Sequence, residues 1–171
     1  MQGQIDNYLI IYIIITRILE LILSNKNTKT LLSRGGVEHF SSHYKFIVFF
    51  HVVFILYFLV ASVSFKGLNL EAFYIFLFIQ ICRFKIIFDL GKYWTTRIIV
   101  LKNEPLIKTG FYKYIKHPNY IIVITEIILV CLIFRDYFAL IFFTVIKAVL
   151  LLIRIHFEDK ANSVRRKKFS V

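Results

Sequence analysis

The 171 residues are 58% hydrophobic and 18% aromatic, with a mean hydropathy of +0.71 and a formal net charge of +12. A soluble domain averages about 45–50% apolar residues, and here the apolar residues occur in long blocks, so the composition excludes an ordinary soluble fold. The net charge does not indicate nucleic acid as a partner, because the basic residues lie beside apolar blocks, where they set topology and meet anionic lipid headgroups. The two cysteines lie in different apolar blocks and predict neither a disulfide nor a metal site.

Five apolar blocks follow one another along the chain, at approximately residues 8–23, 44–64, 70–90, 119–134 and 137–157. A helix needs about 20 mainly apolar residues to cross a bilayer, and lipid cannot satisfy the exposed edges of strands. We therefore predict an all-α, polytopic membrane protein with five transmembrane helices. At this length the whole chain, residues 1–171, is expected to form a single membrane-embedded domain.

Lysine and arginine are divided unequally between the two ends of these helices. Four lie between the first two blocks, six between the third and fourth, and five after the last block. The other side holds only Lys66 and Arg135. The positive-inside rule then places the N-terminus outside and the C-terminus in the cytosol. Residues 91–118 become a long cytosolic loop.

Ionisable residues inside the blocks are expected to face the interior of the bundle, because they are costly in lipid. Arg17 and Glu20 are three residues apart on one helical face, so they either pair or extend toward the headgroups. Lys85 and Asp89, four residues apart, predict a second structural pair. His51 is expected to bond a neighbouring helix.

Glu126 and Lys147 lie near the middles of the fourth and fifth blocks, which a tight turn makes antiparallel neighbours. We predict that they pair, the alternative being a separate partner for each. Lys147, Arg154 and Glu158 share one stripe of the fifth helix. Arg154 and Glu158 either form an ordinary salt bridge or lie at the mouth of a cavity, where the arginine holds an anionic group.

The stretch of residues 106–120, LIKTGFYKYIKHPNY, is both aromatic and basic. Gly110 permits a tight bend or a close approach to a ligand. Pro118 suits the first position of a helix and disfavours helix at His117, so the histidine is expected at a helix N-terminus, where polar or anionic groups bind. The residues predict a site for a polar, partly charged ligand, the alternative being an interfacial belt of aromatic and basic side chains.

Three motifs occur in order around the last two blocks: Gly110-Phe111-Tyr112, Lys116-His117-Pro118-Asn119-Tyr120, and Arg154 followed by Glu158-Asp159. Together they resemble the isoprenylcysteine carboxyl methyltransferase family, small membrane enzymes that use S-adenosylmethionine and carry the pattern G-x-Y, R-H-P-x-Y and R-x-x-x-E-E. Lys116 stands where the family has arginine, and Asp159 where it has a second glutamate. The tail lacks the tyrosine pair of the eukaryotic enzymes.

Further pieces resemble a bacterial branch similar to the alkylpyrone O-methyltransferases. These are Arg34-Gly35-Gly36-Val37-Glu38, Ser42-His43-Tyr44, Leu90-Gly91-Lys92-Tyr93-Trp94 and Ile98-Ile99-Val100. The resemblance implies a protein of the bacterial cytoplasmic membrane that methylates a carboxyl, enol or hydroxyl oxygen of a lipophilic acceptor, either an isoprenylcysteine-type carboxylate or an alkylpyrone-type polyketide.

The resemblance also implies roles for individual residues. Arg154 and Glu158 are the expected catalytic residues, the first orienting an acceptor anion and the second positioning the cofactor or taking a proton. The expected S-adenosylmethionine site comprises Gly110, Tyr112, Lys116, His117, Pro118, Asn119, Tyr120 and Glu158. Two enzymatic alternatives share parts of this pattern, a phospholipid N-methyltransferase and an NADPH-dependent enzyme similar to sterol reductases. A small transporter or membrane scaffold is the non-enzymatic alternative.

Overall fold

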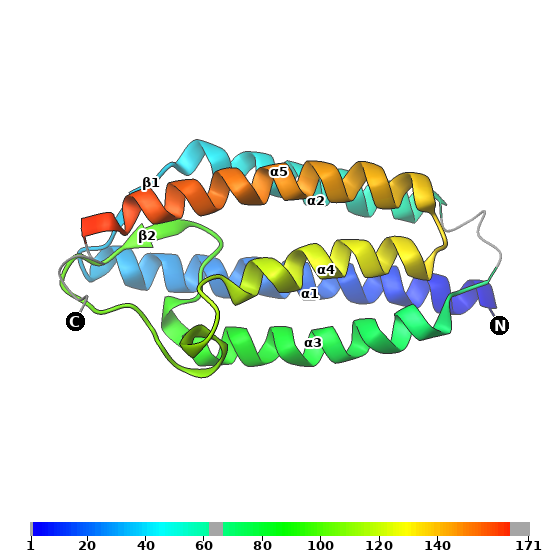
Figure 1. The fold of residues 1–171 in the computed structure, drawn as a ribbon, viewed down its shortest axis with the longest axis horizontal. Helices are drawn as coiled ribbons and strands as arrows, with labels where there is room; N and C mark the ends of the chain where they lie inside the picture. Colours follow the sequence, from blue (N-terminus) through cyan, green and yellow to red (C-terminus); the bar gives the residue numbers. More distant parts are fainter. Residues whose placement is uncertain (1, 62–66, 165–171) are drawn as a thin grey trace.

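The computed structural model describes residues 2–61 and 67–164, and its five α-helices lie side by side along one long axis (Figure 1). The bounds are α1 (Gln2–Ser33), α2 (Ser41–Ala61), α3 (Leu70–Leu90), α4 (Pro118–Ile133) and α5 (Tyr137–Ala161). The predicted all-α class with five helices is confirmed for this part of the chain.

The helix bounds agree closely with the predicted blocks for four of the five helices. The third helix has the predicted bounds, and the fourth is displaced by one residue. The second begins three residues early, and the fifth runs four residues longer. The predicted end of the second block at residues 62–64, together with Lys66 and the basic residues 165–168 used for orientation, lies outside the described residues.

The first helix differs most from the prediction. The predicted block ends at residue 23, whereas the helix continues through a polar stretch to Ser33. Its last turns pack against residues 91–96. Asn27 Nδ2 donates to two carbonyl oxygens of that segment, at 2.9 and 2.7 Å. The hydroxyls of Ser24 and Thr28 bond its threonines at 2.7 and 2.9 Å. These polar side chains therefore stabilise the end of the helix through tertiary contacts. The polar composition of the segment does not predict such contacts.

Three helices, α1, α2 and α5, are long and apolar enough to cross a membrane, and α4 is apolar but shorter. The helices expose large apolar side chains on their outer faces, including Phe88 (82% exposed), Val60 (75%) and Phe138 (71%). Water would disfavour so much exposed apolar surface, whereas lipid does not. The chain is thus a helical integral membrane protein.

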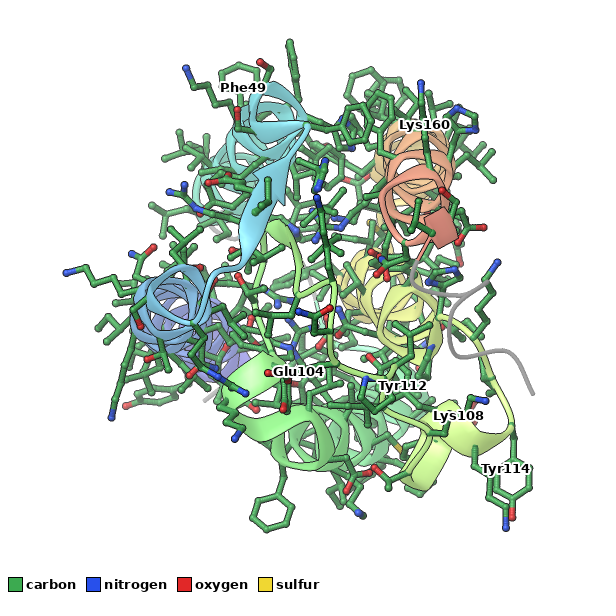
Figure 2. All side chains as sticks on the ribbon, turned by 90° about the vertical axis from the view of Figure 1, so that its left-hand side faces the viewer. Phe49, Glu104, Lys108, Tyr112, Tyr114 and Lys160 are labelled. Carbon is green, nitrogen blue, oxygen red and sulfur yellow. The ribbon has the colours of Figure 1, made fainter. Side chains whose placement is uncertain are left out.

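An end-on view places α4 between α3 and α5, with which it packs most extensively, whereas α2 lies beside α1 and α5 (Figure 2). Aromatic side chains hold α2 against α5. The Phe143 ring of α5 lies 5.0 Å from that of Phe54 and 5.9 Å from that of Phe50, both edge to face. Such aromatic pairs stabilise a helix interface beyond their buried area.

A buried ionic cluster joins α1, α3 and α4. Glu126 accepts hydrogen bonds from Arg17 Nη2 (2.8 Å), Gln80 Nε2 (2.7 Å) and Arg83 Nη1. Glu20 accepts from Arg17 Nη1 (2.9 Å) and Arg83 Nη2 (2.7 Å). The predicted pairing of Arg17 with Glu20 is confirmed, and two arginines balance two carboxylates.

The predicted pairing of Glu126 with Lys147 is wrong, and the alternative of separate partners holds. Lys147, which is 1% exposed, lies with Nζ 2.9 Å from Nε2 of His51 on α2. Glu126 bonds side chains of α1 and α3, whereas Lys147 bonds a side chain of α2. The predictions that His51 bonds a neighbouring helix and that Lys85 pairs with Asp89 are both confirmed.

One end of the bundle carries the longer connections (Figure 1). Two short strands, β1 (Val37–His39) and β2 (Ile98–Val100), pair antiparallel there with Glu38 opposite Ile99. The 3-10 helices η1 (Gly91–Tyr93) and η2 (Gly110–Lys113) flank β2 in sequence. The sequence predicts only a loop over residues 91–118, because a strand of three residues is too short to show an alternating hydrophobic pattern. The strands and the end of α5 enclose the region described next.

Candidate functional site

A cavity of about 610 Å³ opens at this end of the bundle. Its walls come from the end of α1, residues 90–101, the segment before α4, and the last turns of α5. Ligand pockets of about 300–1,000 Å³ are typical of small-molecule and cofactor sites. Seven of the predicted site residues line it: Tyr112, Lys116, His117, Asn119, Tyr120, Arg154 and Glu158.

The N-terminus of α4 forms one wall of the cavity. Pro118 is buried at the first helical position, and His117 precedes it in a non-helical conformation with φ −132° and ψ 59°. The His117 and Tyr120 rings stack, with centroids 5.2 Å apart and planes 15° from parallel. Proline therefore acts structurally, by starting the helix and placing the two rings; it is not among the residues lining the cavity.

The Tyr120 hydroxyl connects α4 with α5. It accepts a hydrogen bond from Arg154 Nε at 2.9 Å and donates one to Glu158 Oε2. The guanidinium carbon of Arg154 also lies 5.7 Å from the centre of the Tyr120 ring. Among the described residues Arg154 and Glu158 form no direct salt bridge, because the tyrosine hydroxyl lies between them.

Carboxylates at the end of α5 face the segment before α4. Lys116 Nζ lies 2.7 Å from Asp159 Oδ2, and both side chains are partly exposed. His117 Nδ1 lies 3.8 Å from Glu158 Oε1, and its Nε2 lies 3.4 Å from Asp159 Oδ1. An ion pair and two close imidazole–carboxylate approaches thus close this side of the cavity.

Tyr112 points inward from η2, whereas Tyr114 points away from the bundle (Figure 2). Burial raises the pKa of the Tyr112 hydroxyl, and the nearby carboxylates of Glu158 and Asp89 raise it further. The hydroxyl therefore stays protonated at neutral pH and can donate to a ligand.

Gly110 does not line the cavity but determines where η2 lies. Its φ is +54°, and a Cβ at this position would collide with Asp89 Oδ2. The chain therefore needs glycine here for two reasons, the left-handed conformation and the close approach to the end of α3.

Three buried polar atoms of cavity-lining residues have no hydrogen-bond partner among the described residues: Arg97 Nε, His117 Nε2 and Asn119 Oδ1. Buried polar groups are normally satisfied, so such atoms at a cavity indicate a ligand site that offers both donors and acceptors. We had assigned no role to Arg97 or Trp94, which line the cavity beside β2. Their place depends on the pairing of β1 with β2, for which a single sequence carries little signal.

The comparisons with known proteins agree with this geometry. The family model for the isoprenylcysteine carboxyl methyltransferase (ICMT) family matches residues 67–163. The uncharacterised protein YpbQ of Bacillus subtilis (strain 168) is 36% identical over 158 residues, covering 90% of this chain and 94% of that protein. An uncharacterised protein of Haemophilus influenzae is 24% identical over 156 residues, covering 88% and 91% respectively.

No solved structure matches the chain. The family match includes α3, α4, α5 and the segment that holds Tyr112, His117 and Tyr120, which are the parts that form most of the cavity. Because this match covers more than half of the chain, the chain belongs to the isoprenylcysteine carboxyl methyltransferase family of membrane methyltransferases.

Proposed function

We propose that this protein is an S-adenosylmethionine-dependent O-methyltransferase that acts on a lipophilic acceptor at the membrane–cytosol boundary. The observation that carries the proposal is the convergence of His117, Asn119 and Tyr120 with Arg154 and Glu158 around one cavity of about 610 Å³. Family membership supports the methyltransferase chemistry.

The residues around the cavity fit this cofactor. Trp94, Tyr112 and Tyr120 offer aromatic surface to an adenine ring or a sulfonium. Asn119 Oδ1, which is buried without a hydrogen-bond partner among the described residues, suits a hydroxyl of a ribose. When bound, the cofactor would supply an electrophilic methyl group on a sulfonium, with S-adenosylhomocysteine as the leaving group when an acceptor oxygen takes the methyl.

The chain's own residues would orient the acceptor and accept its proton where it has one. Displacement at a methyl group needs alignment more than covalent help. Arg154 is 8% exposed, held at Nε by the Tyr120 hydroxyl, and can direct the rest of its guanidinium to an acceptor carboxylate or enolate. Glu158, on the other side of the same hydroxyl, would take the proton of a neutral hydroxyl acceptor.

We propose five membrane spans, with the N-terminus outside and the cavity in the cytosol. The longer connections, residues 34–40 and 91–117, carry seven lysines and arginines, whereas the short turn between α4 and α5 carries only Arg135. These connections and the end of α5 lie at the end of the bundle that holds the cavity (Figure 1). The positive-inside rule assigns that end to the cytosol. In a bacterium the membrane would be the cytoplasmic one, as the two bacterial relatives suggest.

The acceptor is proposed to be an acidic molecule with a long apolar part, either an isoprenylcysteine-type carboxylate or an alkylpyrone-type polyketide. The apolar part would lie in the bilayer, beside the exposed aromatic side chains of α2 and α3. The four pieces similar to the alkylpyrone branch favour the second acceptor class. A type III polyketide synthase encoded in a neighbouring gene would support it independently.

The test uses membranes that contain the protein and S-adenosylmethionine with a labelled methyl group. Label should enter an extractable lipophilic product in the wild type and fall strongly in Arg154→Ala and His117→Ala. Full incorporation by both variants, at equal protein levels, would overturn the proposed site.

Two enzymatic alternatives remain predictions that the same protein can test. Calorimetry with S-adenosylmethionine and with NADPH separates a methyltransferase from a reductase, and the chemical class of the labelled product separates O-methylation from phospholipid N-methylation. A transporter would bind neither cofactor and would depend on Glu126. The three donors that satisfy Glu126 favour a structural role for it instead.

A further inference from the structure

Arg97 lines the same cavity as Arg154 but reaches it from a different part of the chain, immediately before β2. It is not one of the family motif residues that pointed to the site. Its guanidinium is nevertheless held on one edge and has unused donors on the other, as expected of a residue that binds a ligand.

Two side chains from the N-terminal third of the chain hold the Arg97 guanidinium. Its Nη1 donates to both carboxylate oxygens of Glu38, at 3.1 and 3.3 Å. Its guanidinium carbon lies 5.1 Å from the centre of the Tyr44 ring. Glu38 is itself placed by the strand pairing, opposite Ile99. A side chain restrained in this way loses little further conformational freedom when it binds a ligand.

The other edge of the guanidinium has no partner. Glu38 uses only Nη1, and Nε is buried without a hydrogen bond. In the described part of the chain Nη2 also lacks a partner. Nε and Nη2 form the side of a guanidinium that matches the two oxygens of a carboxylate. Arg97 therefore retains, on this edge, the two donors that a bidentate contact with a carboxylate needs.

The charge of the cavity walls favours an anion. Besides Arg97 and Arg154, the lining includes Lys108, Lys113 and Lys116, whereas Glu158 is its only acidic residue within the described ranges. Lys116 is already paired with Asp159, and Arg154 bonds the Tyr120 hydroxyl. Among the described residues, Arg97 is therefore the cavity arginine whose Nε–Nη2 edge is free, whereas Arg154 already uses its Nε.

We infer that Arg97 binds the carboxylate at the amino-acid end of S-adenosylmethionine. This inference rests on the proposed function and extends it to a residue outside the motifs. Glu38 and Tyr44 are then positioning residues, which gives a role to the segment around β1. That segment precedes residue 67, where the family match begins, whereas Arg97 lies within the matched residues.

The experiment compares two stable ligands by calorimetry on the full-length protein in detergent. S-adenosylhomocysteine carries the carboxylate, and 5′-methylthioadenosine has the same nucleoside and thioether without the amino-acid end. Arg97→Gln should weaken binding of S-adenosylhomocysteine by about tenfold or more, as expected for a lost bidentate charge-assisted contact. Binding of methylthioadenosine should not change.

Arg34→Gln is the matched control. Arg34 also pairs with a glutamate, Glu104, and lies over a tyrosine ring, yet it does not line the cavity. Its side chain is 31% exposed, against 34% for Arg97, so a similar loss of stability is expected without a change in ligand preference. Arg97→Lys, which keeps the charge but loses the fork, should give an intermediate loss.

Each outcome decides the inference. Selective loss for S-adenosylhomocysteine supports it. An equal loss of affinity for both ligands in Arg97→Gln overturns it, because Arg97 would then have a structural role. No loss of affinity for either ligand also overturns it, because Arg97 would then have no role in binding. If neither ligand binds the wild-type protein, the proposed function itself fails. If Arg97→Gln does not fold, the same comparison of ligands in Arg97→Lys decides the question.

Discussion

The hydroxyl of Tyr120 on α4 donates a hydrogen bond to the carboxylate of Glu158 on α5. The same oxygen accepts a hydrogen bond from Arg154 at 2.9 Å, so one phenol organises both proposed catalytic side chains. The two motifs that contain these residues are more than thirty positions apart in sequence, and this contact is where they meet.

Tyr120→Phe removes that shared partner and keeps the ring that stacks on His117. Methyl transfer should fall by about 10- to 100-fold, since Glu158 and Arg154 lose their common orientation. The rate at which membranes incorporate a labelled methyl group measures this fall. Tyr137→Phe, at an exposed position on α5, is the control and should remain fully active. Wild-type activity in Tyr120→Phe would contradict this role.

Glu126→Gln should destabilise the bundle. The substitution leaves Arg17 and Arg83 buried with Glu20 as the remaining carboxylate of the cluster. Breaking a buried charge pair costs about 3–5 kcal/mol. Unfolding in detergent, followed by circular dichroism, should show a large loss of unfolding free energy for Glu126→Gln. Almost no loss is expected for Glu71→Gln, at the exposed start of α3. Equal shifts would mean that the cluster contributes little.

Gly110→Ala should impair folding more than Gly35→Ala. Both glycines have positive φ, but a Cβ at Gly35 meets no atom within 4 Å, whereas one at Gly110 meets the Asp89 carboxylate. The left-handed conformation costs alanine about 1–2 kcal/mol at either position. The collision at Gly110 should add about 1–3 kcal/mol.

Combining Gly110→Ala with Asp89→Ala separates the two effects. The double variant should lose less stability than the sum of the single variants, because the carboxylate that collides is gone. Unfolding midpoints measure this difference. Strict additivity would show that the contact with Asp89 does not explain the need for glycine.

Glu104 should make the stability of the connection before α4 depend on pH. The hydrogen bond from the Tyr93 hydroxyl, at 2.7 Å, and the charge of Arg34 lower the pKa of its carboxyl. A lowered pKa in the folded state stabilises the fold above the carboxyl's ordinary pKa, and this contribution is lost as the pH falls through the folded value. The difference in unfolding midpoint between wild type and Glu104→Gln should therefore shrink from pH 7 toward pH 3. A constant difference would contradict the prediction.

The relationships that the sequence predicted correctly are local in the chain. The bounds of α3 and the pairs Arg17–Glu20 and Lys85–Asp89 follow from hydrophobic blocks and helical spacing. The pairing of Glu126 with Lys147 failed because it depends on how α4 and α5 are rotated about their axes, which depth along the helix does not determine.

The sequence by itself determined the membrane class, the number of helices in the described residues and, through the family motifs, which residues of α4 and α5 line one cavity. Hydrophobic length and short-range spacing are sufficient for the first two. Only the tertiary structure decided that a tyrosine hydroxyl separates Arg154 from Glu158 and that β1 brings Glu38 to Arg97. These contacts join segments 34–59 residues apart, and their geometry depends on the packing of whole elements.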